Sequence, residues 1–167
     1  MSDNLDALAQ KTALRAEMRQ RLRAMTPEDR QSLSEEICER VLENDQWQEA
    51  QSVILFTPPS EPIITPLKLD CEARKVAWVA IAQSSRNAAD LHLPDAIDLI
   101  LVPGLAFSKD RHRLGRGGGF FDRLLAGRAA QAFKLGICFS FQLLDTIPTE
   151  PHDIVMDAVV TDGDTMM

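Results

Sequence analysis

Tyrosine is absent from this 167-residue chain, and aromatic residues make up only 5% of it. Cysteine is scarce as well, because Cys38, Cys71 and Cys138 lie far apart and form no C-x-x-C pair. An odd number of widely spaced cysteines provides neither the spacing of a zinc site nor a disulfide framework. We therefore expect three buried or unreactive thiols in a protein of the reducing cytosol.

Long apolar runs are also missing. No segment approaches the ~20 apolar residues that a membrane-spanning helix needs, and residues 1–10 lack the basic and apolar regions of a secretory signal. The formal net charge of −7 argues against a general nucleic-acid binder. We expect a cytoplasmic protein that contacts neither membrane nor nucleic acid.

Familiar phosphate-binding and catalytic motifs are absent too. No Lys-Ser/Thr pair follows the glycines as in a P-loop, and Phe120 occupies the position of the third glycine of a dinucleotide-binding loop. No serine or cysteine lies in a nucleophile context, and no histidines and cysteines are spaced for zinc. Covalent catalysis by a side chain is therefore not expected.

What the chain does contain is an alternation of strand and helix patterns. Short apolar runs predict strands at 52–57, 75–81, 97–102, 134–140 and 154–161. Apolar periodicity and the start signals Thr26-Pro27 and Thr65-Pro66 predict helices over 5–25, from Pro27 toward Asn44, from Pro66 to about Ala73 and from about Gly118 to Arg128. The alternation predicts one α/β domain, residues 1–167, with three α/β/α layers and a largely parallel sheet.

The segment 97–123 is the most informative about function. After its strand, a polar connection leads to Gly115-Arg116-Gly117-Gly118-Gly119, and residues 109–123 hold five Lys or Arg against two Asp. Glycines let the backbone approach phosphate oxygens, and Arg113 and Arg116 offer planar donors to them. A carboxylate beside phosphates, here Asp122, is the usual way to hold Mg²⁺. The pattern favours a phosphate site, with a flexible glycine turn fringed by arginines as the alternative.

Two further places offer ligand contacts. The basic face of the expected first helix includes Lys11, Arg15 and Arg19, and Lys11 and Arg15 lie one turn apart, so they could point together at an anion. A solvated basic face is the alternative. Glu61 lies in a proline-rich loop after the first strand, where it is either a ligand contact or a solvent-exposed acid. The residues alone indicate an enzyme that acts on Mg²⁺–nucleotide or on phosphorylated ligands.

The sequence resembles the 5-formyltetrahydrofolate cyclo-ligase (methenyltetrahydrofolate synthetase) family. The resemblance runs through K-T-A-L-R at 11–15, the strand-then-Glu segment at 52–61, D-L-I-L-V-P-G-L-A-F at 98–107, R-L-G-R-G-G-G-F-F-D-R at 113–123 and P-H-D at 151–153. It implies an ATP- and Mg²⁺-dependent ligase, in which ATP phosphorylates the 5-formyl oxygen of a reduced folate and N10 closes the ring to 5,10-methenyltetrahydrofolate. It also implies the fold shared with certain sugar-phosphate isomerases and CoA transferases, and we expect a monomer.

The same resemblance implies residue roles. The residues that would contact ATP are Lys11, Arg15, Arg113, Leu114, Gly115, Arg116, Gly117, Gly118, Gly119, Phe120 and Phe121. Catalytic roles would fall to Arg116 and Lys11. The folate substrate would contact Glu61, Arg116 and Phe120. Magnesium would be bound by Asp122 and Asp153.

Two departures from the family pattern leave a second hypothesis open. The family carries a longer stretch with a Gly-Ile-x-Glu-Pro-like segment that helps to form the folate pocket, whereas this chain has only residues 82–96. The family's Tyr-Tyr-Asp is Phe120-Phe121-Asp122 here, so any hydroxyl hydrogen bond is lost. The second hypothesis is a family member that binds nucleotide or phosphate without folate turnover.

Overall fold

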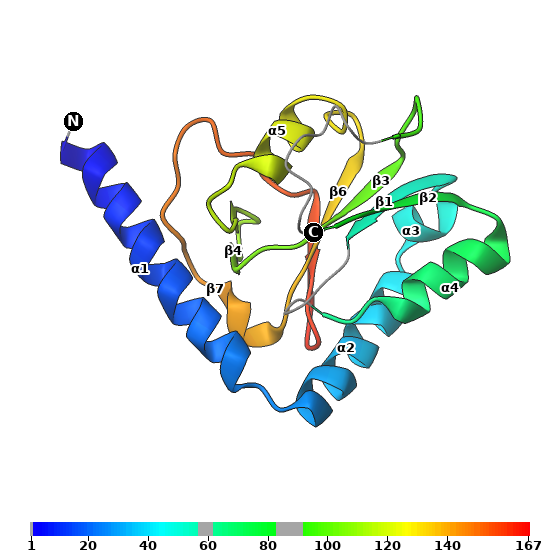
Figure 1. The fold of residues 1–167 in the computed structure, drawn as a ribbon, viewed down its shortest axis with the longest axis horizontal. Helices are drawn as coiled ribbons and strands as arrows, with labels where there is room; N and C mark the ends of the chain where they lie inside the picture. The colour runs from blue at the N-terminus through cyan, green and yellow to red at the C-terminus, as the bar shows by residue number, and fades with distance from the viewer. Residues whose placement is uncertain (1, 57–61, 83–91) are drawn as a thin grey trace.

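The computed structural model describes residues 2–56, 62–82 and 92–167. Within them, one sheet (Figure 1) has the strand order β2 (Ala77–Ile81), β1 (Ser52–Phe56), β3 (Leu99–Val102), β6 (Phe133–Ile137), β8 (Ala158–Val160) and β9 (Thr165–Met166). Neighbouring strands are parallel except β8 and β9, which form an antiparallel edge. The predicted largely parallel sheet is confirmed, and each of the five predicted strands is present with shifted ends.

Helices cover both faces of this sheet. The helices α2 (Pro27–Leu42), α3 (Asp45–Glu49) and α4 (Thr65–Arg74) lie on one side, and α5 (Phe120–Ala126) lies on the other (Figure 1). Side chains of β3 alternate between the two layers, because Leu99 and Leu101 pack with the first group and Ile100 and Val102 pack with α5. Strands buried on both faces appear in sequence as continuous apolar runs. The three predicted layers are confirmed.

Local signals set the helix starts. The Thr26 side chain accepts a hydrogen bond from the backbone N–H of Asp29 at 3.0 Å, which confirms Thr26 as the N-cap of α2. At α4 the prediction was one residue late, because Thr65 is already helical and Ile64 occupies the capping position without a side-chain acceptor. The predicted helix after the glycine loop begins at Phe120 and ends at Ala126, which is shorter than expected.

A second, small sheet was not predicted from the sequence. Its central strand β4 (Ala106–Ser108) pairs antiparallel with β5 (Arg113–Leu114) and parallel with β7 (Leu143–Leu144). Strands of two or three residues are too short for an alternating pattern to show. The buried Gln142 side chain ties this sheet to the end of β3 by donating to the Gly104 carbonyl at 3.0 Å. The sheet positions the site because β5 leads directly into the glycine loop.

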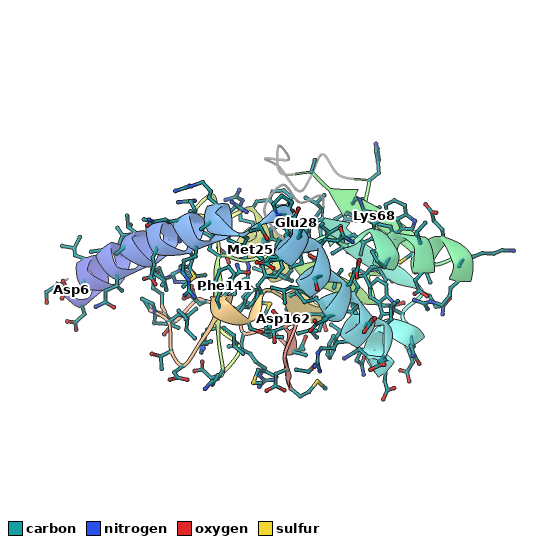
Figure 2. The ribbon with its side chains drawn as sticks, turned by 90° about the horizontal axis from the view of Figure 1, so that it is seen from below. Asp6, Met25, Glu28, Lys68, Phe141 and Asp162 are labelled. Atoms are coloured by element: carbon teal, nitrogen blue, oxygen red, sulfur yellow. The ribbon has the colours of Figure 1, made fainter. Side chains whose placement is uncertain are left out.

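The first helix, α1 (Ser2–Ala24), projects from the body at its N-terminal end. Figure 2 shows Asp6 at the far end of α1, away from the other elements. Of the predicted apolar stripe, Met18 and Leu22 are buried, whereas Leu5 and Leu8 are 68% and 53% exposed. The apolar stripe therefore packs against the core only in the second half of the helix. Neither α1 nor any other helix of the described residues is long and apolar enough to cross a membrane.

The three cysteines are buried and free, as expected from the sequence. Burial raises the pKa of the Cys38 thiol to about 12 and that of the Cys71 thiol to about 11. The pKa of Cys138 is also raised by burial. Because the thiolate is the reactive form, these side chains are chemically quiet in the folded protein.

We predict that the folded protein reacts slowly with a thiol-specific disulfide reagent at about pH 8, since burial removes both access and thiolate. The same protein unfolded in guanidinium chloride should react rapidly with three equivalents, one for each of the free cysteines. The measurement is the absorbance of the released reagent thiol over time. A rapidly reacting equivalent in the folded protein would contradict the burial of these residues.

Candidate functional site

A cavity of about 530 Å³ lies at the carboxyl ends of the central strands. Phe56 ends β1, Ile81 ends β2 and Pro103 follows β3, and all three residues line the cavity. The chain passes from β1 to β2 on one side and then returns to β3 on the other side of β1. Such a reversal is the topological switch point at which open α/β sheets bind ligands.

Another wall of the cavity is the glycine loop, residues 115–119. Gly117 and Gly119 have φ values of 107° and 72°, a region that other residues rarely adopt. The backbone N–H groups of Gly117, Gly118 and Gly119 have no hydrogen-bond partner among the described residues. Successive unpaired N–H groups in such a turn form a concavity that binds anions. The glycine turn expected from the sequence is thus shaped to accept an oxyanion.

Arg113 lies behind this loop with a nearly buried side chain, which is 7% exposed. Its Nε donates to the Pro103 carbonyl at 2.7 Å, and its Nη1 lies 3.3 Å from Oδ1 of Asp122. The guanidinium also stands over the Phe121 ring, 5.2 Å from the ring centroid. One side chain therefore connects the end of β3 with two residues of the first turn of α5.

Burial lowers the pKa of the Arg113 guanidinium to about 10, with Asp122 opposing the shift and Arg116 and Arg15 adding to it. A group with that pKa is still protonated at neutral pH. Arg15, Arg113 and Arg116 all line the cavity, and Asp122 is the carboxylate beside them. Like charges gathered at one wall repel each other, and an anionic ligand relieves that repulsion.

Helix α1 contacts the glycine loop through two arginines. Arg15 donates from Nε to the Gly115 carbonyl at 2.9 Å and lines the cavity. Arg19, one helical turn further, donates from Nη2 to the Arg116 carbonyl at 3.0 Å. The sequence indicates Arg19 only as a member of the basic face of this helix. Its spacing from Arg15 was the available signal, but a partner 97 residues away could not be deduced from the sequence.

Lys11 does not meet Arg15 at the cavity in this structure. Its Nζ lies 3.0 Å from Oε1 of Glu150 and 3.3 Å from Oδ2 of Asp153, and its side chain is 10% exposed. The same Asp153 oxygen accepts the backbone N–H of Glu150 at 2.7 Å. These three residues lie outside the lining of the cavity. The structure thus brings Arg15 to the cavity, and a role for Lys11 at the phosphates stays a prediction.

Asp122, the first of the two predicted magnesium ligands, lies at the cavity. It lines the cavity, and its side chain is 65% exposed. Across the described ranges, no three His, Cys, Asp or Glu side chains gather as a metal centre. Mg²⁺ commonly uses one or two carboxylates together with substrate phosphates, so a single cavity carboxylate fits that ion. Asp153 is bonded to Lys11 instead, and its predicted pairing with Asp122 around a metal stays a prediction.

The remaining candidates differ in their access to the cavity. Phe120 and Phe121 line it and pack edge to face, with ring centroids 5.6 Å apart. Leu114 is 1% exposed with its side chain in the core, so it could offer a ligand only its backbone. Glu61 lies outside the described residues.

An α/β protein with a cationic, glycine-lined cavity at its strand ends suits a ligand that carries phosphate groups. Comparison with known families gives a more specific result. The model of the 5-formyltetrahydrofolate cyclo-ligase family matches residues 7–66 and 62–162. The chain belongs to this family.

Individual relatives and solved structures are consistent with the family match. The 5-formyltetrahydrofolate cyclo-ligase of Mus musculus is 27% identical over 90% of this chain and 92% of its own length. The enzyme of Mycolicibacterium smegmatis is 50% identical over 64 residues, which are 38% of this chain and 33% of that relative. The structure of a 5,10-methenyltetrahydrofolate synthetase from Mycoplasma pneumoniae is 25% identical, with a TM-score of 0.77 over 91% of this chain and 98% of that one. The Aquifex aeolicus synthetase is also 25% identical, with a TM-score of 0.75 over 93% and 91%.

We predict that Gly117→Ala destabilises the protein and that Gly118→Ala does so far less. A Cβ at Gly117 would make only ordinary contacts of 3.8 Å with Arg15, and one at Gly118 would meet nothing within 4 Å. The two substitutions therefore differ mainly in backbone conformation, since Gly117 alone of the two has a positive φ. Forcing alanine into that region costs about 1–2 kcal/mol. Urea unfolding measures the difference, and equal stabilities of the two variants would contradict the loop conformation.

Proposed function

We propose that this protein catalyses the ATP- and Mg²⁺-dependent cyclisation of 5-formyltetrahydrofolate to 5,10-methenyltetrahydrofolate, with release of ADP and phosphate. The observation that supports the proposal most is the glycine loop. In a chain of the cyclo-ligase family, Gly117–Gly119 and four arginines (Arg15, Arg113, Arg116 and Arg123) line one cavity at the strand ends, and the N–H groups of these glycines have no hydrogen-bond partner among the described residues. That arrangement is what the triphosphate of a nucleotide requires.

The chemistry needs no nucleophile from the protein. The formyl oxygen attacks the γ-phosphorus of ATP, and the bond between that phosphorus and the β–γ bridging oxygen breaks to release ADP. N10 of the folate then attacks the formyl carbon and loses its proton, and the carbon–oxygen bond breaks as inorganic phosphate leaves with the formyl oxygen and, overall, with that proton. Both steps depend on the positions of the reactants and on neutralisation of phosphoryl charge. The buried cysteines of this chain are consistent with such a mechanism.

The arginines of the cavity would neutralise that charge. Arg116 is, with Lys11, a catalytic residue of the proposal, because it lies in the glycine loop and lines the cavity. Arg113 is nearly buried and bonded to the Pro103 carbonyl, so it supplies a fixed positive charge in a region of low dielectric. Arg15 lies beside the loop at the cavity edge. Lys11 would join the phosphates only by exchanging its present partners, Glu150 and Asp153, for them.

Asp122 would bind Mg²⁺ together with phosphate oxygens, with Asp153 as the second carboxylate of the proposal. The ion supplies charge neutralisation and orientation of the phosphates when it is bound. Binding would also loosen the contact between Asp122 and Arg113, which is 3.3 Å long and solvent-exposed on the carboxylate side. The carboxylate of Asp122 thus orients Arg113 before the ligand arrives and serves the metal afterwards.

The apolar part of the cavity would take the folate. Phe56 and Ile81 end their strands there, and the rings of Phe120 and Phe121 lie at the start of α5. Flat rings bind well against aromatic side chains. Glu61, Arg116 and Phe120 would provide the remaining folate contacts of the proposal.

Turnover is tested with purified protein, 5-formyltetrahydrofolate, Mg²⁺ and ATP, by following the absorbance of the methenyl product. We expect product that depends on ATP and Mg²⁺, with one ADP and one phosphate released for each ring closed. ATP binding by calorimetry without product would favour the second hypothesis, a family member without folate turnover. Protein that neither binds ATP nor forms product would contradict both.

Arg116→Ala should weaken ATP binding at least tenfold and reduce kcat, because hydrogen bonds to charged groups contribute about 1.5–3 kcal/mol. Arg40→Ala is the matched control, since it removes the same charge from the exposed surface of α2. Calorimetry gives the affinities, and the methenyl assay gives kcat. Equal ATP affinities of the Arg116→Ala and Arg40→Ala variants would contradict the proposal that the glycine loop binds the nucleotide.

A further inference from the structure

The contact between α1 and the glycine loop has a feature that the proposed phosphate site does not use. Arg15 and Arg19 lie one helical turn apart and donate to two consecutive backbone carbonyls, those of Gly115 and Arg116. Arg15 lines the cavity, whereas Arg19 is not among the lining residues. Arg19 therefore contacts the loop from outside and is bonded to its backbone.

The bond made by Arg19 fixes the direction of one peptide group. No peptide bond among the described residues is cis, so the Arg116 carbonyl and the Gly117 N–H point in opposite directions. With the carbonyl bonded to Nη2 of Arg19 at 3.0 Å, the Gly117 N–H points away from that arginine. Gly117 lines the cavity, and its N–H has no hydrogen-bond partner in the part of the chain that the structure describes.

Without such a bond the peptide would rotate easily. Gly117 has a φ of 107°, and glycine crosses between backbone regions that other residues cannot enter. A rotated peptide would present the Arg116 carbonyl oxygen to the cavity in place of the Gly117 N–H. A partial negative charge there would repel a phosphate, and one hydrogen-bond donor would be lost.

We propose that Arg19 is a positioning residue for the nucleotide phosphates: it holds the Arg116–Gly117 peptide so that the N–H, and not the carbonyl, faces the anion. The inference rests on the proposed function, in which this loop binds ATP. Arg19 acts through the loop and touches neither the ligand nor the reacting atoms. Its charge is a secondary feature, and its directed hydrogen bond is the property that matters.

Four proteins test the proposal by calorimetry with ATP and Mg²⁺ and, separately, with inorganic triphosphate and Mg²⁺. They are the wild type, Arg19→Ala, Arg19→Lys and Arg23→Ala. Arg23 is the matched control, because it is an exposed arginine on the same helix, one turn beyond Arg19. We expect about tenfold weaker binding of both ligands by Arg19→Ala and unchanged binding by Arg23→Ala. Arg19→Lys should recover part of the affinity, since an ammonium can also donate to the carbonyl.

Urea unfolding and steady-state kinetics separate positioning from a general structural role. We expect Arg19→Ala to raise KM for ATP about tenfold, to leave KM for 5-formyltetrahydrofolate unchanged and to unfold close to the wild-type midpoint. Equal losses for Arg19→Ala and Arg23→Ala would show that only charge matters, which would overturn the proposal. So would equal changes in both KM values, or unchanged affinity of Arg19→Ala.

Measurements on the wild-type protein and on Arg19→Ala together distinguish the proposed folate turnover from the proposed positioning role of Arg19. Triphosphate binding that depends on Arg19, in a protein that forms no methenyl product, would support the positioning role and overturn the proposed turnover alone. Normal turnover in Arg19→Ala would support the enzyme and overturn the positioning role. A wild type that binds neither ATP nor triphosphate would overturn both.

Discussion

The nearly buried guanidinium of Arg113 is the interaction on which the architecture of this cavity depends. It connects the Pro103 carbonyl, the Asp122 carboxylate and the Phe121 ring, and so fixes the end of β3 against the start of α5. Burying a guanidinium is costly unless its N–H groups find partners, and these contacts supply them. The position of this side chain also favours glycine at position 115, because a Cβ there would lie only 3.1 Å from the terminal nitrogens of Arg113. Arg113 thus requires part of the glycine loop as well as supporting it.

The second constraint is the rotation of α1 about its own axis. Met18 and Leu22 are buried in the core, and they lie in the same turns as Arg15 and Arg19. Fixing the two apolar side chains therefore also fixes the direction in which the two arginines leave the helix. The spacing of these four residues along α1 therefore produces both the contact of the helix with the core and its hydrogen bonds to the loop carbonyls.

The fold could be predicted from the sequence because its strands are continuous apolar runs and its main helices carry start signals, as Thr26 does for α2. The small sheet could not, since strands such as Arg113–Leu114 are too short for any period to show. At the site, the glycine loop was recognisable from its composition, and the structure places it in a cavity wall. The partners of α1 were not recognisable. Lys11 contacts Glu150, and Arg19 contacts the Arg116 carbonyl, and pairs so distant in the chain leave no local pattern.

The two phenylalanines at the start of α5 weigh less against folate turnover than their departure from the family pattern suggests. Both rings line the cavity, and Phe121 keeps a cation–π contact with Arg113 that requires no hydroxyl. A lost hydroxyl hydrogen bond costs about 0.5–1.5 kcal/mol, which lowers an affinity by roughly tenfold at most. A loss of that size would change KM without removing the charge neutralisation that the proposed mechanism assigns to the arginines. The short segment 82–96, most of which lies outside the described residues, is therefore the departure from the family pattern on which the second hypothesis mainly rests.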